Sequence, residues 1–89
     1  MKAIVTVIGK DRVGIIALVS RLLAERGVNV LDISQTVLQD YFTMIMLVDA
    51  SGCTVPFAEL AGELAGEGEE HGIQIRIQRE DIFNAMHKI

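Results

Sequence analysis

FTMIMLV, the sequence of residues 42–48, is apolar at almost every position. Because side chains alternate between the two faces of a β-strand, this stretch would be apolar on both faces. One face would carry Phe42, Met44, Met46 and Val48, and the other Ile45 and Leu47. Residues 2–8, KAIVTVI, repeat the pattern. Strands with two apolar faces are typical of the middle of a sheet, so we expect both stretches to be central strands.

Two further stretches are apolar on one face only. Residues 28–38 place Leu31, Ile33 and Val37 on one face and polar side chains on the other. Residues 73–78 alternate isoleucine with glutamine or arginine. A period of two predicts strands, and the single apolar face predicts that these two are the edges of the sheet. We expect Asp40-Tyr41 to be the tip of the hairpin that joins the second strand to the third.

Residues 14–26 and 55–70 have the helical period instead. Their apolar residues recur three and four positions apart, which predicts one buried face on each helix. The expected inward residues are Ile15, Leu18, Val19 and Leu22 in the first helix, and Phe57, Leu60, Ala61 and Leu64 in the second. Asp11 is the expected N-cap of the first helix, and Thr54 that of the second.

The order β-α-β-β-α-β predicts an α+β fold, a ferredoxin-like two-layer sandwich whose antiparallel sheet has the order 4-1-3-2. One domain would span residues 1–89, with a short C-terminal helix over residues 81–89 that Asp81 would cap. Two long helices shield one face of such a sheet, whereas the central strands are apolar on both. A large exposed apolar patch is unusual on a monomer, so we expect a homodimer in which the tail helix takes part.

Composition argues against several classes of protein. The 89 residues are 51% hydrophobic and carry a net charge of -4, which is unlike a disordered tail or a nucleic-acid-binding domain. No run approaches the ~20 apolar residues that a membrane-spanning helix needs. The single cysteine, Cys53, cannot form an internal disulfide, and small secreted domains usually carry several cysteines. We therefore expect a cytoplasmic protein without nucleic-acid or membrane partners.

Few other residues indicate chemistry. Cys53 beside His71 or His87 would make a nucleophile pair, but a structural cysteine in a loop is the simpler interpretation. One cysteine also excludes a Cys-x-x-Cys metal carrier. The glutamates between residues 59 and 70 predict a solvated helix face, and its glycines would weaken that helix. We expect no catalytic residues, no metal site and no cofactor.

GKDRVGI at residues 9–15 and GVNV at residues 27–30 together resemble an ACT domain. The resemblance runs from residue 2 to residue 79. The chain is most similar to small stand-alone ACT proteins related to the amino-acid-responsive half of the glycine cleavage repressor. ACT domains are regulatory modules that usually bind amino acids and usually work in pairs. The resemblance therefore implies a non-catalytic module that binds an amino acid or a similar small metabolite at a homodimer interface.

Ligand binding is expected at six residues: Asp11, Arg12, Val13, Gly14, Ile15 and Asn29. The resemblance implies that the ligand approaches the backbone at Gly14 and that Asn29 contacts it across the subunit boundary. Backbone N–H groups at a helix N-terminus carry partial positive charge, so the amides around Gly14 can receive a carboxylate. Arg12 can pair with a carboxylate, and Asp11 with an amino group.

Each of these residues also has a plainer explanation, which the sequence leaves open. Gly14 would equally allow close packing of helix on sheet, and Asp11 would cap the helix. Arg12 would be a solvated charge, and Asn29 would complete a turn after Gly27. Two other functions stay open as well. One is a constitutive dimerisation or protein-interaction module without a ligand, and the other is an acylphosphatase-like hydrolase in which Arg12 and Asn29 hold a phosphate.

Overall fold

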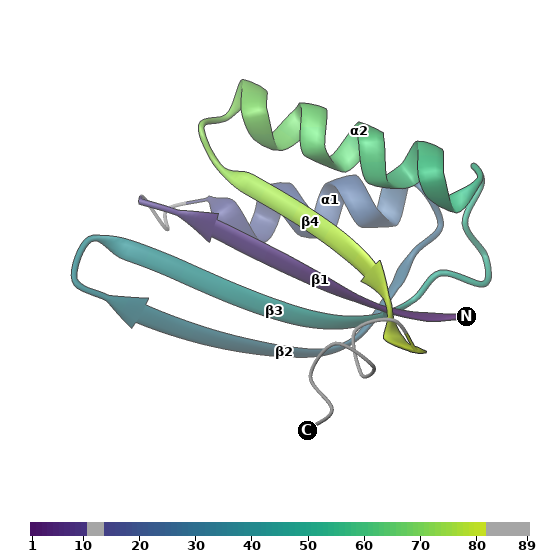
Figure 1. The fold of residues 1–89 in the computed structure, drawn as a ribbon, viewed down its shortest axis with the longest axis horizontal. Helices are drawn as coiled ribbons and strands as arrows, with labels where there is room; N and C mark the ends of the chain where they lie inside the picture. Colours follow the sequence, from purple (N-terminus) through teal and green to yellow (C-terminus); the bar gives the residue numbers. More distant parts are fainter. Residues whose placement is uncertain (11–13, 82–89) are drawn as a thin grey trace.

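Six elements follow one another in the expected order (Figure 1). The computed structural model describes residues 1–10 and 14–81. The elements are β1 (Lys2–Gly9), α1 (Ile15–Glu25), β2 (Asn29–Leu38), β3 (Tyr41–Asp49), α2 (Phe57–Glu70) and β4 (Gln74–Arg79). Glu80 and Asp81 are helical, and the rest of the expected tail helix, residues 82–89, lies outside the described residues.

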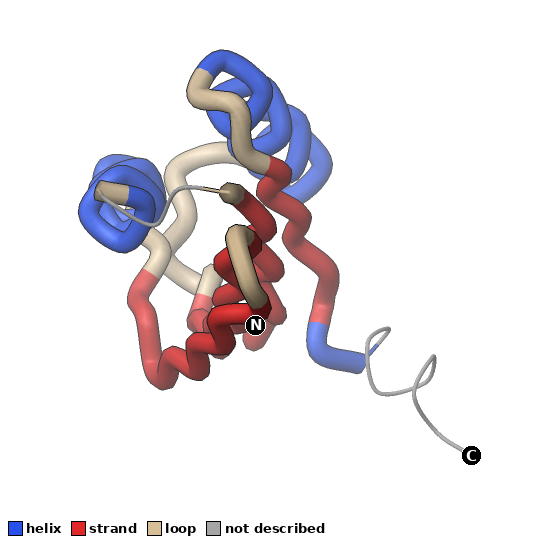
Figure 2. Tube along the Cα trace, turned by 90° about the vertical axis from the view of Figure 1, so that its left-hand side faces the viewer, coloured by secondary structure: helices blue, strands red, loops and turns tan. Residues whose placement is uncertain are grey.

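The four strands form one antiparallel sheet in the order β2-β3-β1-β4, which confirms the predicted topology. The two stretches that are apolar on both faces are the central strands β1 and β3. Val5 of β1 lies between Met46 of β3 and Ile77 of β4. Both helices lie on the same face of this sheet, which makes two layers (Figure 2).

The core fills the space between the sheet and the helices. Alternate residues of β1 and β3 reach it, as the period of two requires. From α1 it takes Ile15, Val19 and Leu22, as expected, together with Leu23, which the helical period did not indicate. From α2 it takes Leu60, Leu64 and Gly68, while the other expected inward residues pack partly buried against its edge.

The expected N-caps of α1 and α2 are both wrong. The N-cap of α1 is Gly14, in the left-handed conformation with φ +79°, and not Asp11. The N-cap of α2 is Pro56, whose carbonyl accepts the first helical hydrogen bond from the Leu60 amide at 2.9 Å. Thr54 precedes this N-cap by two residues, and its amide donates to the Arg26 carbonyl at 3.0 Å, which ties it to the end of α1.

The β2–β3 hairpin turns one residue earlier than expected. Leu38 pairs with Tyr41, so the tip is Gln39-Asp40 and Tyr41 already belongs to β3. Gln39 carries the turn with φ +53°. Glutamine is not among the residues that are enriched in this left-handed conformation. Gln39-Asp40 is therefore not a strong turn signal in the sequence.

The apolar row of β2 lies largely in solvent. Ile33 and Val37 are in register with Met46 and Phe42, so they point to the helix side of the sheet. They are nevertheless 38% and 50% exposed, because β2 lies at the edge and the helices do not cover it. A β-bulge between Val30 and Asp32 leaves Leu31 out of the register, so it does not share the regular face of its neighbours.

The sheet face opposite the helices is also partly apolar. Ile8 and Ile45 of the central strands are 40% and 43% exposed there, beside the half-buried Ile4 and Leu47. The expected leftover apolar surface is therefore present, but it has two parts: this face and the helix-side edge of β2.

Candidate functional site

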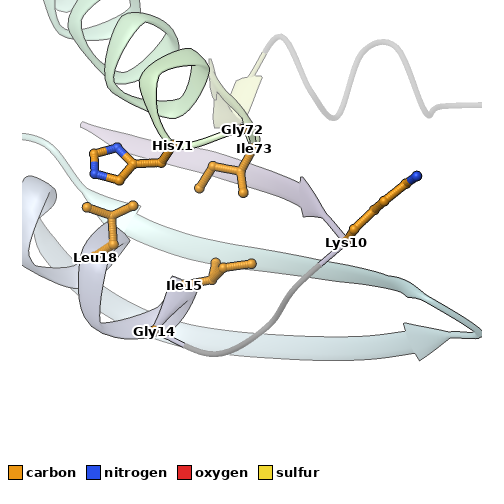
Figure 3. A pocket seen from close by; sticks show the side chains of 7 residues that line it. All are labelled: Lys10, Gly14, Ile15, Leu18, His71, Gly72 and Ile73. Atoms are coloured by element: carbon orange, nitrogen blue, oxygen red, sulfur yellow. The ribbon is translucent and has the colours of Figure 1, made fainter.

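A cavity of about 330 Å³ opens where β1 ends and α1 begins (Figure 3). On one side it is lined by Lys10 and by the first turn of α1, with Gly14, Ile15 and Leu18. On the other side it is lined by the segment that leaves α2 and enters β4, residues 71–73. The first turn of α1 and the segment after the C-terminal end of α2 thus line one cavity.

Gly14 is at the mouth of this cavity, and its conformation requires glycine. Its φ of +79° lies in the left-handed region, where a Cβ is unfavourable. A Cβ built there would meet no atom within 4 Å, so close packing does not explain the residue. Gly9 is the contrasting case, since its Cβ would lie 2.7 Å from Ile73 Cγ2. Open space over the backbone is what a ligand at Gly14 needs.

The N-terminus of α1 offers hydrogen-bond donors beside Gly14. Among the described residues no side chain caps this helix, and its first backbone bond runs from the Leu18 amide to the Gly14 carbonyl at 2.9 Å. The amides of the preceding turn therefore have no partner within the helix. They carry the positive end of the helix dipole, which suits a carboxylate.

His71 closes the opposite end of the cavity, and the sequence did not indicate this role. Its Nδ1 lies 2.8 Å from the Glu67 carbonyl oxygen, which can only accept, so Nδ1 carries the hydrogen. Nε2 is then an acceptor in the neutral ring. The His71 amide also donates to the Gly68 carbonyl at 3.0 Å. These bonds hold the ring against the last turn of α2.

Lys10 lines two cavities. Its Nζ lies 5.8 Å from the centroid of the Tyr41 ring, within the range of a cation–π contact. It also lines a more open cavity of about 400 Å³, together with Tyr41, Glu69 and Gln74. Among the described residues that line the first cavity, Lys10 is the one lysine, arginine, aspartate or glutamate, and Figure 3 shows its side chain directed away from the hollow between Leu18, Ile73 and His71.

The structure brings together part of the expected site. Gly14 and Ile15 line the cavity, whereas Asp11, Arg12 and Val13 lie outside the described residues. Asn29 does not join them within one chain. It pairs with Asp49, which pairs with Lys2 at the start of β1, whereas the cavity follows the other end of that strand.

Cys53 and His71, which the sequence offered as a possible nucleophile pair, do not lie close together. Cys53 is partly buried against the core in the loop before α2, and His71 follows the last residue of that 14-residue helix. A helix of this length separates them by roughly 20 Å, so they form no nucleophile pair. Within residues 1–10 and 14–81, no group of His, Cys, Asp or Glu is placed to hold a metal ion. Over the same ranges, no helix combines the length and apolarity needed to span a bilayer.

Known proteins are similar to this chain over its whole length. The family model described as "ACT domain" matches residues 2–78. A UPF0237 protein of Clostridium acetobutylicum is 57% identical over 89 residues, covering 100% of both chains. A UPF0237 protein of Listeria monocytogenes is 56% identical over the same length, again covering 100% of both.

Solved structures of similar proteins have the same fold as this chain. An ACT domain protein from Streptococcus pneumoniae superimposes with a TM-score of 0.84 at 48% identity, covering 98% of each chain. A candidate glycine cleavage system transcriptional repressor gives a TM-score of 0.70 at 25% identity, covering 86% of this chain and 44% of that one. A formyltetrahydrofolate deformylase from Pseudomonas syringae, at 23% identity and a TM-score of 0.76, shares the fold over 88% of this chain and 27% of its own.

Proposed function

Because this chain belongs to the ACT domain family, we propose that it is a non-catalytic regulatory module that binds an amino acid or a similar small metabolite at a homodimer interface. The observation that carries the proposal is Gly14. It holds a left-handed conformation with open space over its backbone, in the lining of a cavity and at the N-terminus of α1.

The ligand's carboxylate would bind at the start of α1. The backbone amides of the first turn, beginning with that of Ile15, supply the donors. The loop residues Asp11, Arg12 and Val13 complete this half of the proposed site, Arg12 toward the carboxylate and Asp11 toward the amino group. Such a set of groups binds and orients a ligand without a nucleophile, which fits a sensor and not an enzyme.

The second half of the proposed site comes from a second copy. β2 is an edge strand, so its outer backbone groups are available for another strand. Two copies of β2 paired antiparallel would run side by side in opposite directions. Asn29, at the start of β2, would then reach the far end of the other sheet, where that chain's Gly14 lies. The exposed Ile33 and Val37 would be buried in the same contact.

A melting experiment tests the proposal. An amino acid present at ~100 times its dissociation constant should stabilise the protein by about 2.7 kcal/mol. In a domain of this size that corresponds to a rise in Tm of about 10 °C or more. Asn29→Ala should remove the rise, whereas Arg76→Ala, exposed on β4, should keep it. A panel of all twenty amino acids without any shift would contradict the proposal.

A constitutive dimerisation module without a ligand is the second candidate. The exposed apolar residues of β2 and of the open sheet face favour it, because they need a cover whether or not the cavity is used. It predicts a stable dimer by sedimentation and no change in Tm with any amino acid. For either function we place the protein in the cytoplasm, on the ground of its single cysteine.

A further inference from the structure

The described residues give the first cavity aliphatic walls. Ile15 is buried, and Leu18 and Ile73 are half-buried with apolar atoms facing the hollow (Figure 3). None of these three side chains can donate or accept a hydrogen bond. A ligand hydroxyl, amide or carboxylate placed among them would lose its water without gaining a partner, whereas a hydrocarbon group would gain apolar contact.

Figure 3 shows Gly14, Ile15 and Leu18 on the α1 side of the cavity, with His71 and Ile73 facing them from the segment that follows α2. Lys10 lies further away, at the end of β1, and its side chain is directed away from these residues. An amino acid bound with its carboxylate at Gly14 would therefore point its side chain past Ile15 and Leu18 toward His71. The volume of about 330 Å³ is at the lower limit of ordinary ligand cavities, which suits a ligand of few heavy atoms.

We propose that this cavity selects an amino acid with a short, branched aliphatic side chain, and that His71 sets the limit on side-chain length. The inference rests on the proposed function and specifies its ligand. His71 is suited to be a stop because its ring is fixed by the bond from Nδ1 to the Glu67 carbonyl oxygen, at 2.8 Å. His71 follows the last residue of α2, so the stop is attached to a regular element and not to a long loop.

Calorimetric titration of the full chain with L-valine, L-leucine, L-methionine and L-serine tests the selection. Valine and leucine should bind at least about tenfold more tightly than serine, the discrimination expected of a hydrophobic wall. If serine binds as tightly as leucine, this inference is overturned while the proposed function stands. If none of the twenty amino acids binds, the proposed function fails and this inference fails with it.

Variants test the role of His71 separately from the fold. His71→Ala should open the end of the cavity and raise the affinity for methionine relative to valine by about tenfold. His71→Gln keeps most of the volume and should leave that ratio near the wild-type value. An unchanged methionine-to-valine ratio in a folded His71→Ala protein would overturn the assignment of His71.

Discussion

Arg26 Nε donates a hydrogen bond of 2.7 Å to Oε1 of Glu63, which ties the end of α1 to the middle of α2. The same guanidinium donates from Nη1 to the Leu22 carbonyl at 3.0 Å. Its side chain is 16% exposed and that of Glu63 is 34% exposed, so water only partly screens the pair. The two helices are thus fixed relative to one another by a charged contact at the end of the domain away from the cavity.

Glu63→Gln should lower the free energy of unfolding by about 1 kcal/mol, because the half-buried guanidinium loses a charged acceptor. Urea unfolding followed by circular dichroism measures the change. Glu25→Gln is the control, since Glu25 is exposed and lies 3.8 Å from Arg26. The control should change stability by less than about 0.5 kcal/mol. Equal losses in the two variants would contradict this account of the contact.

The glycines of α2 should respond in opposite directions to alanine. Gly62 and Gly66 face open space, so each alanine should stabilise the helix by about 0.5–1 kcal/mol. Gly68 is buried, and a Cβ there would lie 2.8 Å from the Ile73 carbonyl oxygen. Gly68→Ala should therefore lower the Tm, because helix and strand must separate. A higher Tm for Gly68→Ala would show that this approach is not tight.

The ionised Asp49 carboxylate stabilises the folded protein, and this stabilisation is lost at low pH. The side chain of Ser51 at 2.6 Å and its amide at 2.9 Å donate to the carboxylate and, with the N-terminal ammonium, lower the Asp49 pKa from 3.8 to about 2. The folded pKa is below the unfolded value, so the contribution is complete above about pH 4 and is lost as pH falls toward about 2.

The Asp49 titration can be followed directly by the NMR shift of its carboxyl carbon. Wild-type protein should titrate near pH 2, and Ser51→Ala should titrate at a higher pH because the side-chain donor, the largest cause of the shift, is gone. Ser34→Ala, a serine of β2 remote from Asp49 in sequence and register, should leave the titration unchanged. A wild-type pKa near 3.8 would contradict the assigned bonds.

The architecture was predictable because it depends on side-chain alternation. The two-sided apolar stretches around Val5 and Met46 lie at the centre of the sheet, and the one-sided stretches lie at its edges. The helix ends were less predictable. Asp11 and Thr54 are residue types that favour the N-cap position, but the observed N-caps are Gly14 and Pro56. In the structure the Thr54 amide donates a hydrogen bond to the Arg26 carbonyl, and Gly14 in the left-handed conformation is the N-cap of α1.

Some residues of the candidate site could be predicted from local sequence. Those that reach the cavity only through packing of distant segments could not. Gly14 stands out in the loop after β1, and the structure places it at the cavity. His71 did not stand out, because only the three-dimensional fold brings the end of α2 to the end of β1. The exposure of Ile33 and Val37 was also hidden, since periodicity gives the face of a strand but not how far the helices reach over it.

Mixed dimers test most directly whether Gly14 and Asn29 act on one ligand from two chains. Gly14→Ala and Asn29→Ala should each abolish amino-acid binding when alone. Mixed one to one, about half of the dimers combine the two variants, and each of these has one site with both residues intact. The account predicts that about a quarter of the wild-type sites return with wild-type affinity. No recovery of binding, in a sample whose mixed dimers are verified by native mass spectrometry, would contradict it.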